Sequence, residues 1–271
     1  MNYQVYLPSR ELQNFVKCFW SLEDDGRSKP QKQRVVPDGC MEMIFHFGDR
    51  YRQYFNNGSS YIQPRSFIFG QITHYLEIEP TGVTGIIAAR FLPEGLQPLL
   101  PVPVSSLQDR AIVLSDIFGE QAIQLEQALL TSGNIPQRIQ LIESFLISKQ
   151  TQPTRADTII ANCVEVIMRS QGKIGVADLA QQMKTTRRQL ERRFASSVGM
   201  SPKRLARAVR LQAALRMLEQ KKFDSLTDLA YENGYYDQAH FIRDFKEFTG
   251  TSPKSFYAGN LRFATLFAEA D

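Results

Sequence analysis

The sequence has few cysteines and no long hydrophobic run, and each shortage argues against a class of protein. Its three cysteines, Cys18, Cys40 and Cys163, are widely spaced and form no CxxC pair. A scattered, odd-numbered set predicts free thiols in a reducing compartment, not a disulfide framework or a zinc site. The longest apolar run is far shorter than the ~18 residues that span a bilayer, and the first residues do not have the pattern of a secretory signal. We therefore expect a cytoplasmic protein with no membrane partner.

Histidine is equally scarce, with three residues in the whole chain. His46 and His74 are the two in the first half, which contains no His-x-His pair. We expect both to be structural, and a metal site of the cupin type is the alternative. The sequence predicts no catalytic residue, no metal site and no cofactor, because no nucleophile has an activating partner in view.

The basic residues are unevenly distributed. Residues 1–150 hold 13 Lys and Arg against 15 Asp and Glu, whereas residues 151–271 hold 19 against 13. The stretch from Lys184 to Lys222 alone has 12 basic residues and 2 acidic ones. Such a local excess is typical of a surface that binds a polyanion, and a solvated helix face is the alternative.

The first half predicts a β-rich domain with trailing helices. Extended runs bounded by Gly or Pro are expected at residues 34–36, 40–47, 66–69, 74–78 and 82–91. Apolar residues at three- and four-residue spacing predict helices at residues 116–130 and 136–146. The polar stretch at residues 148–154 is the expected linker. The chain should therefore divide into domains at residues 1–148 and 155–260.

The second half predicts helices only, and it contains an internal repeat. Three short blocks recur at an offset of 50 or 51 residues. They are residues 178–180 and 228–230, 190–194 and 241–245, and 199–203 and 250–254. A supersecondary unit has thus been used twice, which is too few copies for a solenoid.

The first copy is expected to be a short helix over residues 176–183, a turn and a second helix. Thr186 and Gln189 have the spacing of a capping box at the start of the second helix. Leu190 and Phe194 share its apolar face, and Arg188 and Arg192 lie almost opposite. Gly199 should end the helix, and Ser201-Pro202 should start the next one.

The second copy repeats this arrangement. Asp237 is the expected cap, and Phe241 and Phe245 face the core. Arg243 and Lys246 point away from that core. A helix over residues 202–220 should join the copies, with an apolar side and a basic stripe of Arg204, Arg207 and Arg210.

A short helix, a turn and a second helix with a polar outer face is the form of a helix-turn-helix. In that motif the second helix enters the major groove of DNA. Arg can bind guanine O6 and N7 together, and Gln can pair with adenine. At ~1.5 Å per residue, the joining helix could hold the two units about one DNA turn apart.

Residues 155 to about 258 resemble the DNA-binding domain of the AraC/XylS family of bacterial transcription regulators. The segments that carry the resemblance are residues 234–246 with Gly250-Thr251-Ser252-Pro253, and the matching pattern from Leu179 to Pro202. The resemblance implies seven helices in two subdomains, whose recognition helices, at about residues 186–198 and 237–249, lie on one face of bent DNA.

The resemblance also implies which side chains touch DNA. The base-reading positions fall on Arg188 and Arg192 in the first recognition helix, and on Gln238, His240 and Arg243 in the second. Thr186, Arg187, Gln189 and Lys246 are the implied supporting contacts. Promoter DNA and RNA polymerase are the implied partners, and the chain would be nucleoid-associated when bound.

The first ~148 residues resemble, more loosely, an uncharacterised N-terminal domain of some family members. The residues that carry this are 12–20, 36–40, 70–73 and 91–95. Analogy implies a small barrel or sandwich, so that the whole chain is α+β, and a role in effector sensing or dimerisation. A small-molecule effector, a homodimer and a pure protein-contact module all stay open here. Trp20 and its neighbouring aromatics could line an apolar pocket, although a core is the commoner arrangement.

A DNA-associated enzyme with a catalytic N-terminal domain is the alternative function. It would need an activated nucleophile or a metal cluster. Cys40 has only His46 near it in the sequence, so a transcription regulator without enzymatic activity is the favoured prediction.

Overall fold

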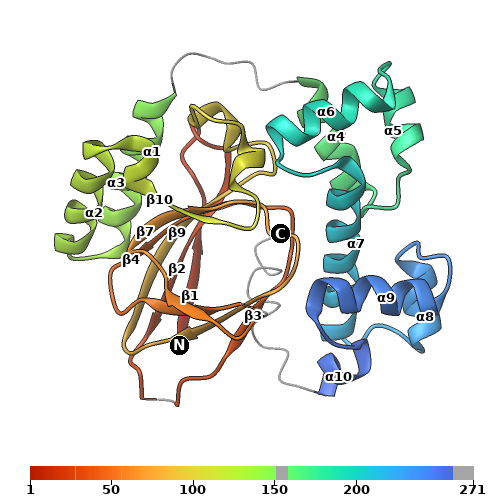
Figure 1. The fold of residues 1–271 in the computed structure, drawn as a ribbon, viewed down its shortest axis with the longest axis horizontal. Helices are drawn as coiled ribbons and strands as arrows, with labels where there is room; N and C mark the ends of the chain where they lie inside the picture. The colour runs from red at the N-terminus through yellow and green to blue at the C-terminus, as the bar shows by residue number, and fades with distance from the viewer. Residues whose placement is uncertain (28, 56, 151–157, 259–271) are drawn as a thin grey trace.

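The computed structural model describes all of the chain except residues 28, 56, 151–157 and 259–271. The N-terminal half is built of antiparallel sheets followed by three helices, and the C-terminal half is helical (Figure 1). This confirms the predicted α+β class. The strands are β1 (Asn2–Tyr6), β2 (Val16–Asp24), β3 (Gln33–Val35), β4 (Glu42–His46), β5 (Tyr51–Tyr54), β6 (Ser60–Ile62), β7 (Ser66–Phe69), β8 (Leu76–Pro80), β9 (Thr84–Phe91) and β10 (Ala111–Val113).

These strands form two sheets. The larger has the order β1-β2-β9-β4-β7-β10, and the smaller has the order β3-β8-β5-β6. Every pair of neighbouring strands is antiparallel. In the part of the chain that the structure describes, no named strand pairs across the two sheets, so the domain is sandwich-like and not a closed barrel.

The core of the N-terminal half lies between the larger sheet and three helices, α1 (Leu114–Phe118), α2 (Glu120–Thr131) and α3 (Ile135–Lys149). The helix expected at residues 116–130 is two helices, because Gly119 adopts a φ of +58° and breaks the run. Helix α3 continues through Lys149, so the first two residues of the predicted linker are helical. Much of the remainder of that linker lies outside the described residues.

The C-terminal half contains seven helices within its described residues, as the family resemblance implied. They are α4 (Thr158–Arg169), α5 (Val176–Gln182), α6 (Arg187–Ser197), α7 (Pro202–Glu219), α8 (Leu226–Glu232), α9 (Gln238–Thr249) and α10 (Pro253–Ala258).

Two separate hydrophobic cores divide these helices into two subdomains. Phe194 belongs to the first core and Phe245 to the second. Helix α7 contributes to both, through Leu205 in the first and Leu215 in the second. It is therefore a shared structural element of the two subdomains and not a mere connector.

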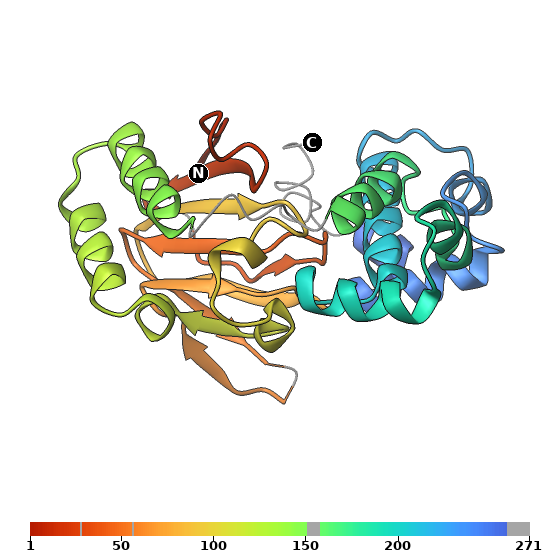
Figure 2. The ribbon, with the colours of Figure 1, turned by 90° about the horizontal axis from the view of Figure 1, so that it is seen from above.

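The two helical groups lie on opposite sides of the sheets. In both views, α1–α3 occupy one side and α4–α10 the other (Figures 1 and 2). Val36, which directly follows β3, packs into the second core of the C-terminal half. None of the described helices combines the length and apolar character needed to cross a membrane.

Candidate nucleic-acid interface

The first helix-turn-helix unit consists of α5, a turn and α6. Thr186 Oγ1 accepts a hydrogen bond from the Gln189 backbone at 3.2 Å, and Gln189 Oε1 accepts one from the Thr186 backbone at 3.3 Å. This reciprocal pair is the predicted capping box, and it fixes where α6 begins. The predicted restart is also present, because Ser201 caps α7 and Pro202 is its first residue.

The outward face of α6 presents two arginines. Arg188 and Arg192 are exposed, whereas Leu190 and Phe194 on the opposite face are fully buried. Among the residues that the structure describes, neither the Arg188 nor the Arg192 guanidinium forms a hydrogen bond or an ion pair. Arg187, also exposed, pairs with Glu191 at 2.9 Å. Arg188 and Arg192 are therefore the guanidinium groups of this face that remain available to an external anion.

The second unit, α8, a turn and α9, has the same construction. Asp237 Oδ1 accepts a hydrogen bond from the His240 backbone at 2.6 Å, so Asp237 is the predicted cap. Gly250 ends α9 with a left-handed φ of +75°. Arg243 and Lys246 are exposed, and no polar partner is recorded for their side chains among the described residues. Arg192 and Arg243 thus occupy equivalent places in the two copies.

Two of the predicted base-reading side chains are half-buried and engaged within their own subdomain. The His240 ring packs edge-on against Tyr235, with 5.3 Å between ring centroids, and its Nε2 lies 3.7 Å from Asp244 Oδ1. Gln238 Oε1 accepts a hydrogen bond from Thr227 at 3.1 Å. Both would have to leave these partners to reach a base, so their contact with DNA stays a prediction.

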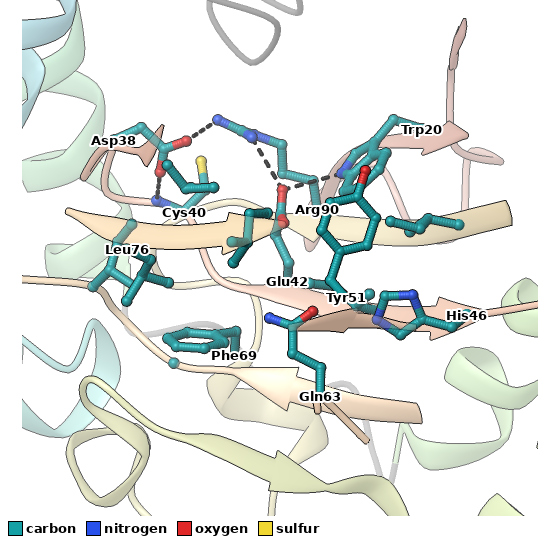
Figure 3. A pocket seen from close by; sticks show the side chains of 16 residues that line it. Trp20, Asp38, Cys40, Glu42, His46, Tyr51, Gln63, Phe69, Leu76 and Arg90 are labelled. Carbon is teal, nitrogen blue, oxygen red and sulfur yellow. Dashed lines mark hydrogen bonds and ion pairs between the residues drawn. The ribbon is translucent and has the colours of Figure 1, made fainter. Parts of the chain in front are cut away.

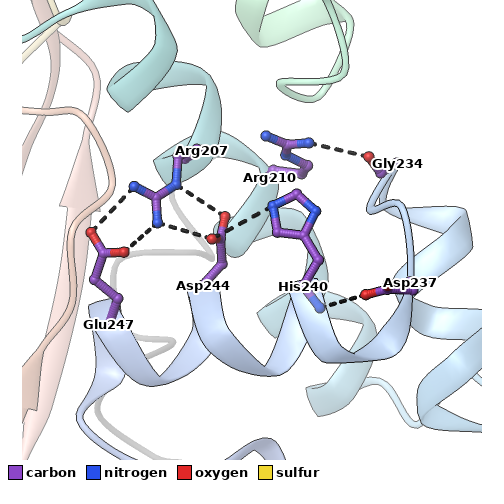
Figure 4. Close-up of polar contacts among 7 residues, drawn as sticks. All are labelled: Arg207, Arg210, Gly234, Asp237, His240, Asp244 and Glu247. Atoms are coloured by element: carbon purple, nitrogen blue, oxygen red, sulfur yellow. Dashed lines mark hydrogen bonds and ion pairs between the residues drawn. The ribbon is translucent and has the colours of Figure 1, made fainter.

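The basic stripe of α7 is used inside the molecule. Arg207 pairs with Asp244 and Glu247 of α9, and Arg210 donates a hydrogen bond to the Gly234 carbonyl oxygen at 3.1 Å (Figure 4). Arg204 donates one to the Thr73 carbonyl oxygen of the N-terminal half at 2.7 Å. The stripe therefore positions α9 and the N-terminal half.

The Arg207 network compensates a buried charge. Asp244 is a carboxylate that is only 3% exposed, because it lies on α9 between the buried residues Phe241 and Phe245. Burial alone would lower the pKa of Arg207, but its hydrogen bonds with the two carboxylates raise that pKa above its ordinary value. The hydrogen bond from Arg207 also lowers the pKa of Glu247. A carboxylate flanked by two core aromatics was the sequence signal for this ion pair, and sequence reasoning missed it.

The groups considered for catalysis or metal binding are separated in the fold. His46 is buried at the end of β4, whereas His74 is exposed on a loop. No cluster of three or more His, Cys, Asp or Glu side chains suited to a metal occurs among the described residues. All three cysteines are buried and none is in a disulfide, and burial raises the pKa of Cys40 to about 11. Such a thiol is a poor nucleophile at neutral pH.

The two halves match two different family descriptions. Residues 179–258 match the family described as "Helix-turn-helix domain", and residues 4–113 match "Domain of unknown function (DUF6597)". A transcriptional activator named RhaS from Pectobacterium atrosepticum is 24% identical over 80% of this chain and 76% of its own length. An uncharacterised helix-turn-helix transcriptional regulator from Haemophilus influenzae is 32% identical, over 34% of this chain and 31% of its own length. The crystal structure of apo ToxT from Vibrio cholerae aligns with a TM-score of 0.45 and 14% identity, over 89% of this chain and 97% of that chain.

The family match of residues 179–258 agrees with the repeated units and their capped, arginine-bearing helices. Residues 179–258 form a helix-turn-helix domain, as the resemblance to the AraC/XylS family predicted. The chain is a DNA-binding transcription regulator with an N-terminal regulatory domain.

Proposed function

We propose that α6 and α9 enter successive major grooves on one face of a promoter. The observation that carries this proposal is the equivalence of Arg192 and Arg243, which are exposed and 51 residues apart in two copies of one unit. Their guanidinium groups suit guanine edges. Helix α7 has 18 residues, which at ~1.5 Å each is about 27 Å of rigid spacing between the copies.

The contacts divide by chemistry. Arg188, Arg192 and Arg243 are proposed to read bases, together with Gln238 and His240 once these leave their partners. Thr186, Gln189 and Lys246 are proposed to bind phosphates and set the register of each helix, together with Arg187 once it leaves Glu191. The DNA-binding domain is proposed to span residues 155–260 and the regulatory domain residues 1–148, with a small-molecule effector, RNA polymerase and a second copy of the chain as further partners.

Selection of the full-length protein on a pool of random duplexes tests this proposal. We expect an enriched asymmetric motif with two blocks about one helical turn apart, because one chain carries two unlike recognition helices. Affinity for that motif should be measured at two salt concentrations alongside a scrambled duplex. Binding that shows no enrichment and falls steeply with salt would leave only phosphate attraction, and would contradict the proposal.

A further inference from the structure

The space between the two sheets is a pocket with an apolar wall and a polar end. The pocket is partly enclosed by the two sheets and partly open to solvent. The larger sheet contributes Ile44, Phe69 and Ile86, and the smaller sheet contributes Val35, Leu76 and Ile78. Most of the lining is apolar, which is typical of a small-molecule site.

The charged groups at the polar end already satisfy one another. Arg90 Nη1 donates a hydrogen bond to Glu42 Oε1 at 3.1 Å, and Arg90 Nη2 pairs with Asp38 (Figure 3). Trp20 Nε1 donates to the same Glu42 oxygen at 3.1 Å. The lining thus holds two carboxylates around one guanidinium, so it offers no spare positive charge to an anion.

His46 provides a hydrogen-bonding group at another part of the pocket. Its side chain lies beside Tyr51 and Gln63 (Figure 3). The residue is 1% exposed, and neither ring nitrogen makes a hydrogen bond of normal geometry to a described residue. Burial lowers its pKa to about 4, an effect that the nearby Gln63 amide opposes, so the ring is neutral. A buried neutral imidazole without a strong partner suits a hydroxyl or similar group of a ligand.

The wall of this pocket is also the surface that holds the C-terminal half. Val35 faces the pocket, whereas the preceding residue, Arg34, donates a hydrogen bond to the Thr249 carbonyl oxygen at 3.0 Å, and the following residue, Val36, lies in the core of α7–α9. This alternation is what a strand produces, because successive side chains point to opposite faces.

The turn after β3 also has neighbouring residues that face the pocket on one side and α7 on the other. Asp38 faces the pocket, and the carbonyl oxygen of its neighbour Pro37 accepts a hydrogen bond from Gln212 of α7 at 2.9 Å. Gly39 lies so close to Leu205 of α7 that a Cβ there would collide with it.

A third segment, residues 72–76, also alternates between side chains that face the pocket and groups that contact the C-terminal half. Ile72 and Leu76 face the pocket. Between them, the Thr73 carbonyl oxygen accepts a hydrogen bond from Arg204, and the Tyr75 ring lies against Gly250 at the end of α9. A group that moves this wall from the pocket side therefore moves the contacts of α7 and α9.

We propose that the pocket binds a small, uncharged, largely apolar molecule with a hydrogen-bonding group, and that its presence changes how the N-terminal half holds the two helix-turn-helix units. The coupling part of this inference rests on the proposed DNA-reading role of α6 and α9. The ligand part does not, so the two can be tested separately.

The first test uses Trp20, the single tryptophan of the chain, as a reporter of the pocket. The full-length protein is titrated at pH 7.5 with cyclohexanol, cyclohexanecarboxylate and cyclohexylammonium, which share a ring and differ in charge. We expect a saturable change in fluorescence with cyclohexanol alone, and its loss in Ile44→Phe, which fills the pocket. No saturable change with cyclohexanol, or tighter binding of either the carboxylate or the ammonium, would overturn the ligand class.

The second test measures affinity for the selected DNA motif with and without saturating cyclohexanol. We expect a change of about fivefold or more in wild type, the lower end of ordinary allosteric coupling. Arg34→Ala/Gln212→Ala should keep the fluorescence response and lose this change, and Ile44→Phe controls for solvent effects. An unchanged affinity in wild type would overturn the coupling, whereas failure to bind DNA under any condition would count against the proposed function and leave the fluorescence result standing.

Discussion

The side-chain amide of Gln212 donates a hydrogen bond to the carbonyl oxygen of Pro37, 175 residues away in the sequence. Gln212 lies in the middle of α7, and Pro37 begins the turn that carries Asp38 into the pocket of the N-terminal half. One contact therefore joins the helix shared by the two helix-turn-helix units to the wall of the pocket between the sheets. It gives a physical route by which the regulatory half can act on DNA binding.

Removal of either equivalent arginine should weaken specific binding. Arg192→Ala and Arg243→Ala should each cost ~1–3 kcal/mol on the cognate motif and relax base preference at one position, because a forked contact with a base is lost. Fluorescence anisotropy on the motif and on single-base variants measures both effects. Arg10→Ala removes the same charge from an exposed site in the N-terminal half and should change neither. Unchanged specificity in either recognition-helix variant would show that its assigned role is wrong.

Lys246 should behave as a phosphate contact. Lys246→Ala is expected to weaken binding about equally on cognate and scrambled duplexes, and to reduce the slope of log affinity against log salt by about 1. The measurement is a salt titration of both duplexes with wild type and variant. A loss confined to the cognate duplex would instead make Lys246 a base-reading residue.

The ion pair between Arg207 and Asp244 should matter for stability more than for DNA contact. Arg207→Met leaves a nearly buried carboxylate without its partner, which should lower the free energy of unfolding by about 3 kcal/mol. The double variant Arg207→Met/Asp244→Asn should recover much of that loss, because the uncompensated charge is gone. Urea denaturation of the four members of this cycle gives the coupling. If the losses of the two single variants simply add in the double variant, Arg207 and Asp244 are not coupled, which would contradict the stabilising role of their ion pair.

His46 should make stability fall in mild acid. Its pKa is lowered from 6.5 to about 4 in the folded protein, so the unfolded chain binds the extra proton between these values. Stability from this source is complete above about pH 6.5 and is lost as the pH falls toward 4, by a total on the order of 3 kcal/mol. Urea unfolding of wild type and His46→Leu at pH 7.5 and pH 5 measures it. We expect a smaller pH dependence in the variant, and an equal one would contradict the account.

The C-terminal half was largely predictable from sequence because its determinants are local. Thr186, Asp237 and Gly250 act on backbone groups within a few residues, so their roles as caps and stop could be read from spacing. Which side chains of α9 read bases was harder to predict from sequence. Whether His240 points to a groove or to Tyr235 depends on packing against residues that spacing alone does not place.

The N-terminal half was predicted only in part, because its structure depends on distant pairing. The runs at residues 66–69 and 82–91 were found, since both are rich in apolar residues and bounded by Gly or Pro, and β7 and β9 are fully buried. Strand β2 was missed, although it pairs with both β1 and β9. The pocket and the interdomain contacts were beyond sequence reasoning, since Arg34 and Thr249 meet across 215 residues.

A hydroxyl-radical footprint of the full-length protein on its selected DNA motif tests the central claim most directly. The account predicts two protected blocks on one face of the duplex, about 10 base pairs apart centre to centre. It also predicts that Arg192→Ala weakens protection of one block and Arg243→Ala that of the other. A single protected block, or the same block weakened by both substitutions, would contradict reading by two recognition helices.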